Sequence, residues 1–355
     1  VADLRNYRTI ITIPKTRKGY SGVGLFVKNE IPVLKAEEGI TGWLRCQNVA
    51  YRDLGAALIG GYPLEEELSS DRALKLDSEG RCVIAELPND LVVASVYCPA
   101  NSMATDEGEE FRLEFLHVLL TRLRKLHDMG KKIILFGDIN VALDLIDSAE
   151  AIDERIKNNL ISPNGVYTPQ FELLNPEACA EFKLSRPARK LLNTHVHYSL
   201  DSPTLPTQPS QFLYDTTRIK QGRRRAMYTV WNTLTSARLS NYGSRIDLIL
   251  ASSKEMCDNA TEADIWPSIK GSDHCPIFTD FAIDFPQVEQ PKLPFEARLM
   301  YKVARNRDIL LMFAPKKANS STENNNHKRS LDFDLVEVKR AKLEQLVRSN
   351  ETGPR

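Results

Sequence analysis

The chain has 355 residues, of which 42% are hydrophobic, and its 47 Lys and Arg balance its 47 Asp and Glu. This composition can fill a sizeable core, and a net charge of zero excludes nucleic-acid binding through bulk positive charge, so such binding needs local basic patches. No apolar run reaches the roughly 20 residues that cross a bilayer, so we expect no membrane partner. Six cysteines without a C-x-x-C pair predict a reducing compartment.

Short runs rich in β-branched and aromatic residues predict strands along most of the chain. They lie at residues 7–13, 23–29, 81–87, 91–97, 132–137, 227–231, 245–251 and 275–283. The clearest helix is predicted over 106–129, where Asp106 and Glu109 form a capping-box start and large apolar residues recur at helical spacing. Gly130 ends this pattern.

The unit from residue 91 to residue 137 predicts a parallel crossover of strand, helix and strand, whose two strands end at the same edge of the sheet. Ligands of open α/β sheets bind at that edge. The first strand ends at Tyr97, and the second is followed by Asp138 and Asn140. Because alternate residues of an extended segment project to one side, we expect Asp138 and Asn140 to converge.

A third acid, Asp247, lies between Ile246 and Leu248 in a strand that is otherwise apolar. A buried lone carboxylate is costly, so Asp247 needs a partner, and His274 in GSDHCPI would be a suitable one. A carboxylate fixes the tautomer of histidine and favours its charged form, which suits binding of a phosphate anion. A purely structural His–Asp hydrogen bond is the alternative.

These side chains together supply the groups that phosphodiester hydrolysis requires. They are Tyr97, Asp138, Asn140, Asp247, Asp273 and His274. The set contains acids that can orient water, a histidine paired with a carboxylate, and a phenol near the charge that develops on phosphate. Oxygen ligands with few dedicated carboxylates favour Mg²⁺, with Mn²⁺ as an alternative, over zinc.

Several motifs in fixed order resemble the exonuclease III branch of the endonuclease/exonuclease/phosphatase superfamily. They are KGYSGVG, SVYCPAN, GDINVA, GSRIDLILAS and GSDHCPI. Within that branch, AEEGITG, LDSEGRCV and NYGSRID are similar to the fungal form of the second type of class II apurinic/apyrimidinic (AP) endonucleases. The similarity spans about residues 5–285. It implies a two-sheet α/β sandwich that forms a catalytic domain over residues 1–285 of a DNA base-excision-repair nuclease.

The resemblance implies a role for each residue of the predicted site. Asp138 would orient or deprotonate the attacking water, and Asn140 would hold water or phosphate. His274 would bind the scissile phosphate, oriented by Asp247. Asp273 would help to bind Mg²⁺ directly or through water, with Asp138 and Asn140 as further ligands.

The resemblance also implies contacts with DNA. Tyr97 would contact the phosphate and stabilise the departing 3′ oxygen, and Asn101 would contact a phosphate nearby. Tyr20 and Arg81 would touch the DNA backbone, which positions a duplex without reading its sequence.

An insertion rich in Pro, Asn and Ser occupies about residues 150–222, and we expect it to be an irregular surface elaboration. His195 and His197 within it lack further metal ligands, so we assign them no function. Basic and aromatic residues alternate just after the insertion. We expect this segment near DNA because it leads into the strands of the site, although a solvated loop is the alternative. Its residues are Arg223, Arg224, Arg225 and Trp231.

Two departures from the family pattern change what we expect of this chain. Family members begin with a strand carrying Asn-x-Asn or Asn-x-Asp and continue to a strand ending in Gln-Glu, whose Glu binds the metal. Neither occurs here, so we expect an N-terminally incomplete domain that lacks its first strands and is weakly active or inactive. The abasic-sugar pocket carries Val230, Ser244 and Ile246 where related enzymes have Phe, Trp and Leu. A smaller wall favours cleavage at recessed or blocked 3′ ends over incision at abasic sites.

After Phe285 the chain becomes polar and of low complexity, which predicts a flexible tail over residues 286–355. Within it, NRDILLMF resembles a degenerate sliding-clamp binding box. Its anchor positions are Asn306, Ile309, Met312 and Phe313. A short helix that packs back on the domain is the alternative. Basic pairs in the tail predict a nuclear location.

Two other functions remain as alternatives. A phosphoinositide or sphingolipid phosphoesterase of the same superfamily is disfavoured by YGSRID and by the basic segment that carries Trp231. A non-catalytic scaffold that binds DNA and the sliding clamp is favoured by the missing metal-binding Glu.

Overall fold

The structure is a computed structural model. It describes residue 4 and residues 6–300, apart from 17–18, 47, 163–169, 198–208, 292 and 294. These residues belong to the first of two compact units, Val1–Asn306. The predicted clamp box and the basic pairs of the tail lie outside the described residues.

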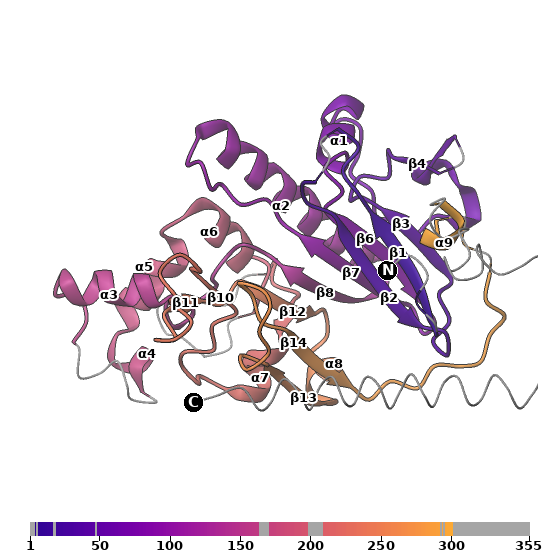
Figure 1. The fold of residues 1–355 in the computed structure, drawn as a ribbon. Helices are drawn as coiled ribbons and strands as arrows, with labels where there is room; N and C mark the ends of the chain where they lie inside the picture. The colour runs from indigo at the N-terminus through magenta and orange to yellow at the C-terminus, as the bar shows by residue number, and fades with distance from the viewer. Residues whose placement is uncertain are drawn as a thin grey trace, which may run out of the picture. The chain divides into compact units, whose positions relative to one another are not determined.

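A six-stranded sheet forms the centre of the fold (Figure 1), with the order β3-β6-β7-β8-β12-β9. Its strands are β3 (Lys35–Glu38), β6 (Cys82–Leu87), β7 (Leu91–Tyr97), β8 (Lys132–Asp138), β12 (Asp247–Ala251) and β9 (Tyr214–Asp215). All neighbours are antiparallel except β7 and β8, which are parallel. The predicted crossover is therefore confirmed.

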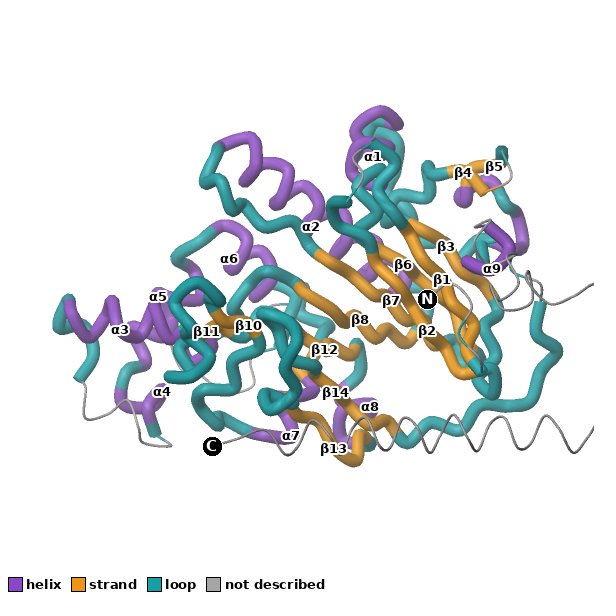
Figure 2. The backbone as a smooth tube through the Cα atoms, viewed as in Figure 1, coloured by secondary structure: helices purple, strands orange, loops and turns teal. Residues whose placement is uncertain are grey.

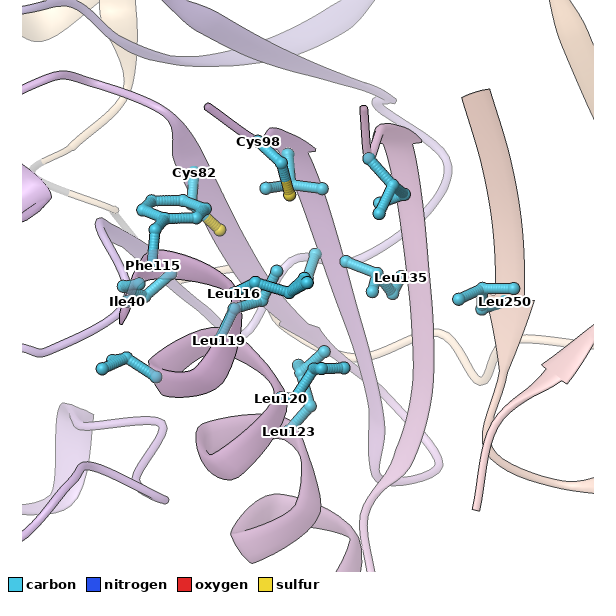
Figure 3. Close-up of a cluster of buried hydrophobic side chains, with 14 of the residues drawn as sticks. Ile40, Cys82, Cys98, Phe115, Leu116, Leu119, Leu120, Leu123, Leu135 and Leu250 are labelled. Atoms are coloured by element: carbon cyan, nitrogen blue, oxygen red, sulfur yellow. The ribbon is translucent and has the colours of Figure 1, made fainter. Parts of the chain in front are cut away.

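The crossover helix α2 (Asp106–Asp128) covers one face of this sheet. Its N-cap is Thr105, whose hydroxyl accepts the Gly108 amide, so the predicted capping box from Asp106 to Glu109 is wrong. Figure 3 shows leucines of α2 facing strand residues such as Leu135. Burial of each such leucine stabilises the fold by about 1.5–3 kcal/mol.

Two smaller sheets lie against the other face of the central sheet, which gives the expected two-layered sandwich (Figure 2). They pair β1 (Tyr7–Thr12) with β2 (Val23–Lys28), and β13 (Ala260–Ile265) with β14 (Ile277–Phe281). Ile10 of β1 and Leu25 of β2 share a core cluster with Val93 and Ile249 of the central sheet. Alternate residues of β2 are buried, as its sequence pattern predicts.

The insertion is largely helical in its described part, so the expectation of an irregular segment is wrong. Its helices are α3 (Ala149–Lys157), α4 (Phe171–Leu174), α5 (Pro176–Leu184), α6 (Pro187–Asn193) and α7 (Thr216–Gln221). Pro176 and Pro187 occupy the first turn of α5 and α6, where proline starts a helix rather than breaking one. Helix α6 packs on α2, and β9 extends the central sheet.

Short elements complete the described chain. They are β4 (Arg45–Cys46), β5 (Val49–Ala50), α1 (Ser70–Asp77), β10 (Val230–Trp231), β11 (Gly243–Ser244), α8 (Lys254–Asp258) and α9 (Ala297–Met300). The strand predicted over 227–231 is thus reduced to the two residues of β10, which pair with β11.

Residues 284–297, here called the closing segment, return to β1 after β14. Glu296 forms a buried ion pair with Arg8, and Ile10 bridges Glu296 as in an antiparallel sheet. Arg8 also donates to Gln290 at 2.7 Å. Phe295 is 1% exposed. The boundary that the sequence predicts at residue 285 is therefore too early, because Leu293, Phe295, Glu296 and Ala297 are buried in the domain.

We expect Phe295→Ala to lower the free energy of unfolding by about 3–5 kcal/mol, because it removes a buried ring. That ring packs edge-on against Tyr51, with 5.9 Å between centroids. Leu299→Ala is the control, since Leu299 is 48% exposed and its loss should change stability by less than about 0.5 kcal/mol. Urea unfolding followed by circular dichroism measures both. Similar small effects would contradict the placement of the closing segment in the core.

Candidate active site

Three predicted site residues lie in one row across neighbouring strands of the central sheet. Tyr97 at the end of β7 is opposite Asp138 at the end of β8, and Asp138 is opposite Asp247 at the start of β12. Because β12 runs antiparallel to β8, its first residue meets the last residue of β8. The strand register thus holds a phenol and two carboxylates at one edge, and each is half-buried.

Asn140 meets Asp138 through a tight turn. Its backbone N–H donates to Asp138 Oδ1 at 2.9 Å, and its side-chain Nδ2 donates to Asp138 Oδ2 at 3.1 Å. Nδ2 also donates to the carbonyl of Cys98 at 2.8 Å, which ties the turn to the end of β7. Asn140 has a φ of 56°, a left-handed conformation that asparagine tolerates. The predicted convergence is correct, but the predicted cause, an extended alternation, is wrong.

The predicted pairing of His274 with Asp247 is present, with 2.8 Å between Nδ1 and Asp247 Oδ2. The hydroxyl of Thr229 accepts the amides of Ile246 and Asp247 at 3.1 and 3.2 Å, which fixes the backbone that carries the carboxylate. His274 itself bridges Val230 of β10. The Asp247 bond leaves Nε2 of His274 as the ring nitrogen available to a ligand.

The electrostatic setting shifts the pKa of both Asp138 and His274. Burial, followed by the neighbouring charge of Asp247, raises the pKa of Asp138 to about 6. The hydrogen bond that His274 donates to Asp247 raises the pKa of His274; burial opposes this shift, while the charges of Asp247, Asp138 and Asp273 add to it. The edge therefore combines a carboxylate that accepts a proton near neutral pH with a histidine that favours its cationic form.

Arg81 lies inside the protein, with 2% of its side chain exposed. It donates to the Tyr20 hydroxyl at 2.6 Å and to the Tyr97 carbonyl at 3.2 Å, and pairs with Glu79. Its guanidinium also lies 5.1 Å and 4.9 Å from the ring centres of Tyr20 and Tyr97. The expectation that Arg81 touches DNA is therefore wrong, and Arg81 instead positions these two tyrosines. Tyr20 is 37% exposed.

The basic segment after α7 also has partners inside the protein. Arg223 pairs with Asp144, at 2.8 Å, and with Glu172. Arg224 pairs with Asp264. These ion pairs fasten the insertion to the rest of the fold. Arg223, with 14% of its side chain exposed, is engaged inside the protein, which corrects its assignment as a DNA contact. Arg224 keeps 45% of its side chain exposed, so its contact with DNA stays a prediction.

Three further predicted DNA contacts are residues that the structure places in contact with other parts of the protein or buries. The guanidinium of Arg225 lies 5.2 Å from the ring centre of Phe171. Trp231 is 3% exposed, which excludes it as a stacking surface in this conformation. Asn101 accepts the Thr105 amide and donates to the Thr105 carbonyl, so it shapes the loop that enters α2. The sequence shows the basic and aromatic character of these residues but not their partners.

The predicted metal ligands do not form a site by themselves. Asp273 is exposed, and Ser272 Oγ lies 3.2 Å from its Oδ1. Both oxygens of Asp138 accept hydrogen bonds from Asn140. Nowhere in the part of the chain that the structure describes do three His, Cys, Asp or Glu side chains gather as a metal site needs.

A hollow of about 620 Å³ opens beside Asp273. Val230 and Ser244 line it, as the sequence predicts for the abasic pocket, together with the loop after β10. Ile246 is not part of its lining and packs instead against the core cluster around Phe182, which corrects that assignment. The lining thus combines the small side chains of Val230 and Ser244 with larger ones, which include Trp231, Leu234 and Tyr242.

Two residues near the site escape the sequence analysis. Arg112 of α2 donates to the carbonyl of Asn140 at 2.6 Å, and Thr229 holds the backbone of Asp247. Arg112 lies in the second turn of α2, the helix that follows β7 and Tyr97 in the chain. The sequence could have indicated Arg112, because it closely follows the strand that ends at the predicted site.

The chain is similar over most of its length to a known protein family and to curated relatives. The profile described as "Endonuclease/Exonuclease/phosphatase family" matches residues 2–274. DNA-(apurinic or apyrimidinic site) endonuclease 2 of Saccharomyces cerevisiae is 45% identical over 89% of this chain and 64% of its own length. The Schizosaccharomyces pombe protein of the same name is 34% identical, over 80% of this chain and 48% of its own length.

A solved structure has the same fold. The Xenopus laevis APE2 catalytic domain matches with a TM-score of 0.63 at 25% identity, over 85% of this chain and 83% of that one. This chain spans about half to two-thirds of the length of the curated relatives above.

We expect Asp138→Asn to stabilise the protein in EDTA above pH 6. A carboxyl whose pKa rises from 3.8 to about 6 on folding gives stability that is present below pH 3.8 and lost as pH rises through 6. At pH 8 its ionised form should therefore cost the fold about 1–3 kcal/mol. Melting temperatures should be higher for the variant at pH 8 and equal near pH 4. Asp280→Asn, at an exposed position, is the control, and a lower melting temperature of Asp138→Asn at pH 8 would refute this account.

Proposed function

The chain belongs to the endonuclease/exonuclease/phosphatase family, and from that premise we propose that it is a DNA-repair nuclease. The observation that carries the proposal is the row of Tyr97, Asp138 and Asp247, with His274 bonded to Asp247. Similar proteins are named AP endonuclease 2 and exodeoxyribonuclease. We propose cleavage 5′ to abasic sites and removal of blocked or mismatched nucleotides from 3′ ends.

The geometry supports a direct hydrolysis of the phosphodiester. Asp138 takes a proton from water, whose oxygen attacks phosphorus, and the bond from phosphorus to the 3′ oxygen breaks. The Nε2 proton of His274 faces the phosphate and balances the negative charge that develops there. Asp247 accepts the Nδ1 proton of His274 across 2.8 Å and so orients the imidazolium, which also carries the Nε2 proton. Tyr97 lies beside Asp138, in position to donate a proton to the departing 3′ oxygen.

We propose Mg²⁺ as the cofactor, with Mn²⁺ as a substitute, since nucleases of this family generally use a divalent metal. When bound, the ion would neutralise charge on the phosphate. Asp138, Asn140 and Asp273 supply oxygen donors, but no three His, Cys, Asp or Glu side chains of the described residues gather into a metal site. The chain of this sequence should therefore bind the ion weakly and cleave slowly.

The hollow beside Asp273 supports a preference for 3′ ends. Val230 and Ser244 leave it wide, so it holds a whole nucleotide as readily as a base-free sugar. We propose duplex DNA with recessed 3′ ends as the main substrate. The sliding clamp as partner and the nucleus as location remain predictions from residues outside the described part of the chain.

We expect Mg²⁺-dependent cleavage of a duplex with a blocked, recessed 3′ end to exceed incision at an internal abasic site by about tenfold, the range that loss of pocket contacts with a sugar allows. Labelled duplexes resolved on denaturing gels measure both rates. Asp138→Asn should reduce both by about 100-fold or more while the protein stays folded. A strong preference for abasic sites would refute the pocket argument. DNA binding without cleavage, with or without Mg²⁺, would favour the non-catalytic scaffold.

The rate should show a bell-shaped dependence on pH. Asp138 must be ionised, so the rate rises as pH passes about 6, and His274 must be protonated, so the rate falls above its raised pKa. Asp247→Asn removes the main interaction that raises the pKa of His274 and should move the falling limb to lower pH. Single-turnover rates from pH 5 to 9 test this. A falling limb that stays in place would show that His274 is not the group that titrates.

A further inference from the structure

Arg238 connects two loops at the edge of the site. It lies in the loop of residues 232–242, between β10 and β11, here called the β10–β11 loop. Its guanidinium donates to three backbone carbonyls of the loop that precedes His274. The bonds run to Ser272 at 3.0 Å, Pro267 at 3.0 Å and Ile269 at 2.6 Å. The residues from 267 to 274 are here called the histidine loop.

Trp231 adds a second attachment between the same segments. The guanidinium of Arg238 stacks 4.5 Å from the centre of its buried ring. The backbone N–H of Trp231 donates to the Asp273 carbonyl at 3.0 Å, and that of Cys275 donates to the Thr229 carbonyl at 2.9 Å. Arg238 therefore donates hydrogen bonds to the histidine loop and also stacks on Trp231, the residue whose backbone N–H binds the Asp273 carbonyl.

The β10–β11 loop also faces the hollow beside Asp273. Leu234 in this loop is 94% exposed and lines the hollow together with Asp273. A nucleotide in the hollow would therefore touch the loop that Arg238 fastens. The planar fork of a guanidinium can reach three carbonyls at fixed angles, which a lysine ammonium on a flexible stem does not reproduce.

We propose that Arg238 is a positioning residue that makes the β10–β11 loop and the histidine loop one rigid unit, so that a DNA strand seated against the first loop holds His274 in place. The link to DNA rests on the proposed function, whereas the clamp rests on the four contacts of Arg238. A misplacement of about 1 Å at a reacting centre costs about 100-fold in rate, so loss of the clamp should slow the chemical step.

The test compares Arg238→Gln and Arg238→Lys with Arg72→Gln. Arg72 is a matched control, because it is also partly exposed and makes three hydrogen bonds, but to Glu110 and Glu114 of α2. We expect Arg238→Gln to lower kcat by about 10- to 100-fold with KM changed less than about threefold, and Arg238→Lys to recover part of that loss. Arg72→Gln should leave both unchanged.

Amide hydrogen exchange tests the clamp without relying on cleavage. The amides of Trp231 and Cys275, whose bonds join the two segments, should exchange at least about tenfold faster in Arg238→Gln. The melting temperature should fall by no more than about 2 °C. A purely structural role would lower the melting temperature and leave kcat unchanged.

Exchange and kcat equal to those of Arg72→Gln would overturn the proposal. If wild type does not cleave DNA but exchange rises as expected, the clamp stands and the nuclease assignment fails. If wild type cleaves DNA and the exchange does not change, the clamp alone fails.

Discussion

The register of β7, β8 and β12 is the constraint on which the candidate site depends. It places Asp138 and Asp247 opposite each other on adjacent strands, which lie about 4.8 Å apart in a sheet. Two half-buried carboxylates at that spacing repel, and this repulsion adds to burial in raising the pKa of Asp138. His274 relieves one of them by its bond to Asp247. The edge is thus least stable when both carboxylates are ionised, and binding of a proton or a cation lowers its free energy. Carboxylates in such a setting are suited to acid–base catalysis.

A buried network of charges holds this register. Arg245, two residues before Asp247, donates to both oxygens of Asp147 at 2.8 and 3.0 Å and to Asp215 at 2.7 Å. Burial alone would raise the pKa of Asp147, but Arg218 and Arg245 outweigh it and hold the pKa well below its usual range. Removing one member would leave an unpaired buried charge, so the network resists change as a unit. It joins β12 and β9 to the chain that follows β8, and so links the insertion to the site.

The sequence predicts those features whose cause is local. Asp247 interrupts an apolar strand, so the sequence predicts that its carboxylate requires a partner. The expected partner, His274, is the one found. The environment of Arg81 could not be read, because an arginine bonded to Tyr20 and Glu79 has the same sequence signature as one that faces a phosphate. The end of the domain was missed because burial of the closing segment depends on Arg8, far away in the chain. Local sequence patterns predict helices, strands and buried polar groups that require a partner. Contacts between residues far apart in the chain decide which side chains can reach a substrate.

In the proposed reaction Asp247 and His274 act as one unit on the phosphate. A double-mutant cycle measures this directly, with single-turnover cleavage of a blocked 3′ end by wild type, Asp247→Asn, His274→Gln and the double variant. Our account predicts that His274→Gln costs the most, and that adding Asp247→Asn lowers the rate little further, because Asp247 acts through His274. Losses that multiply in the double variant would show two independent roles and contradict the account.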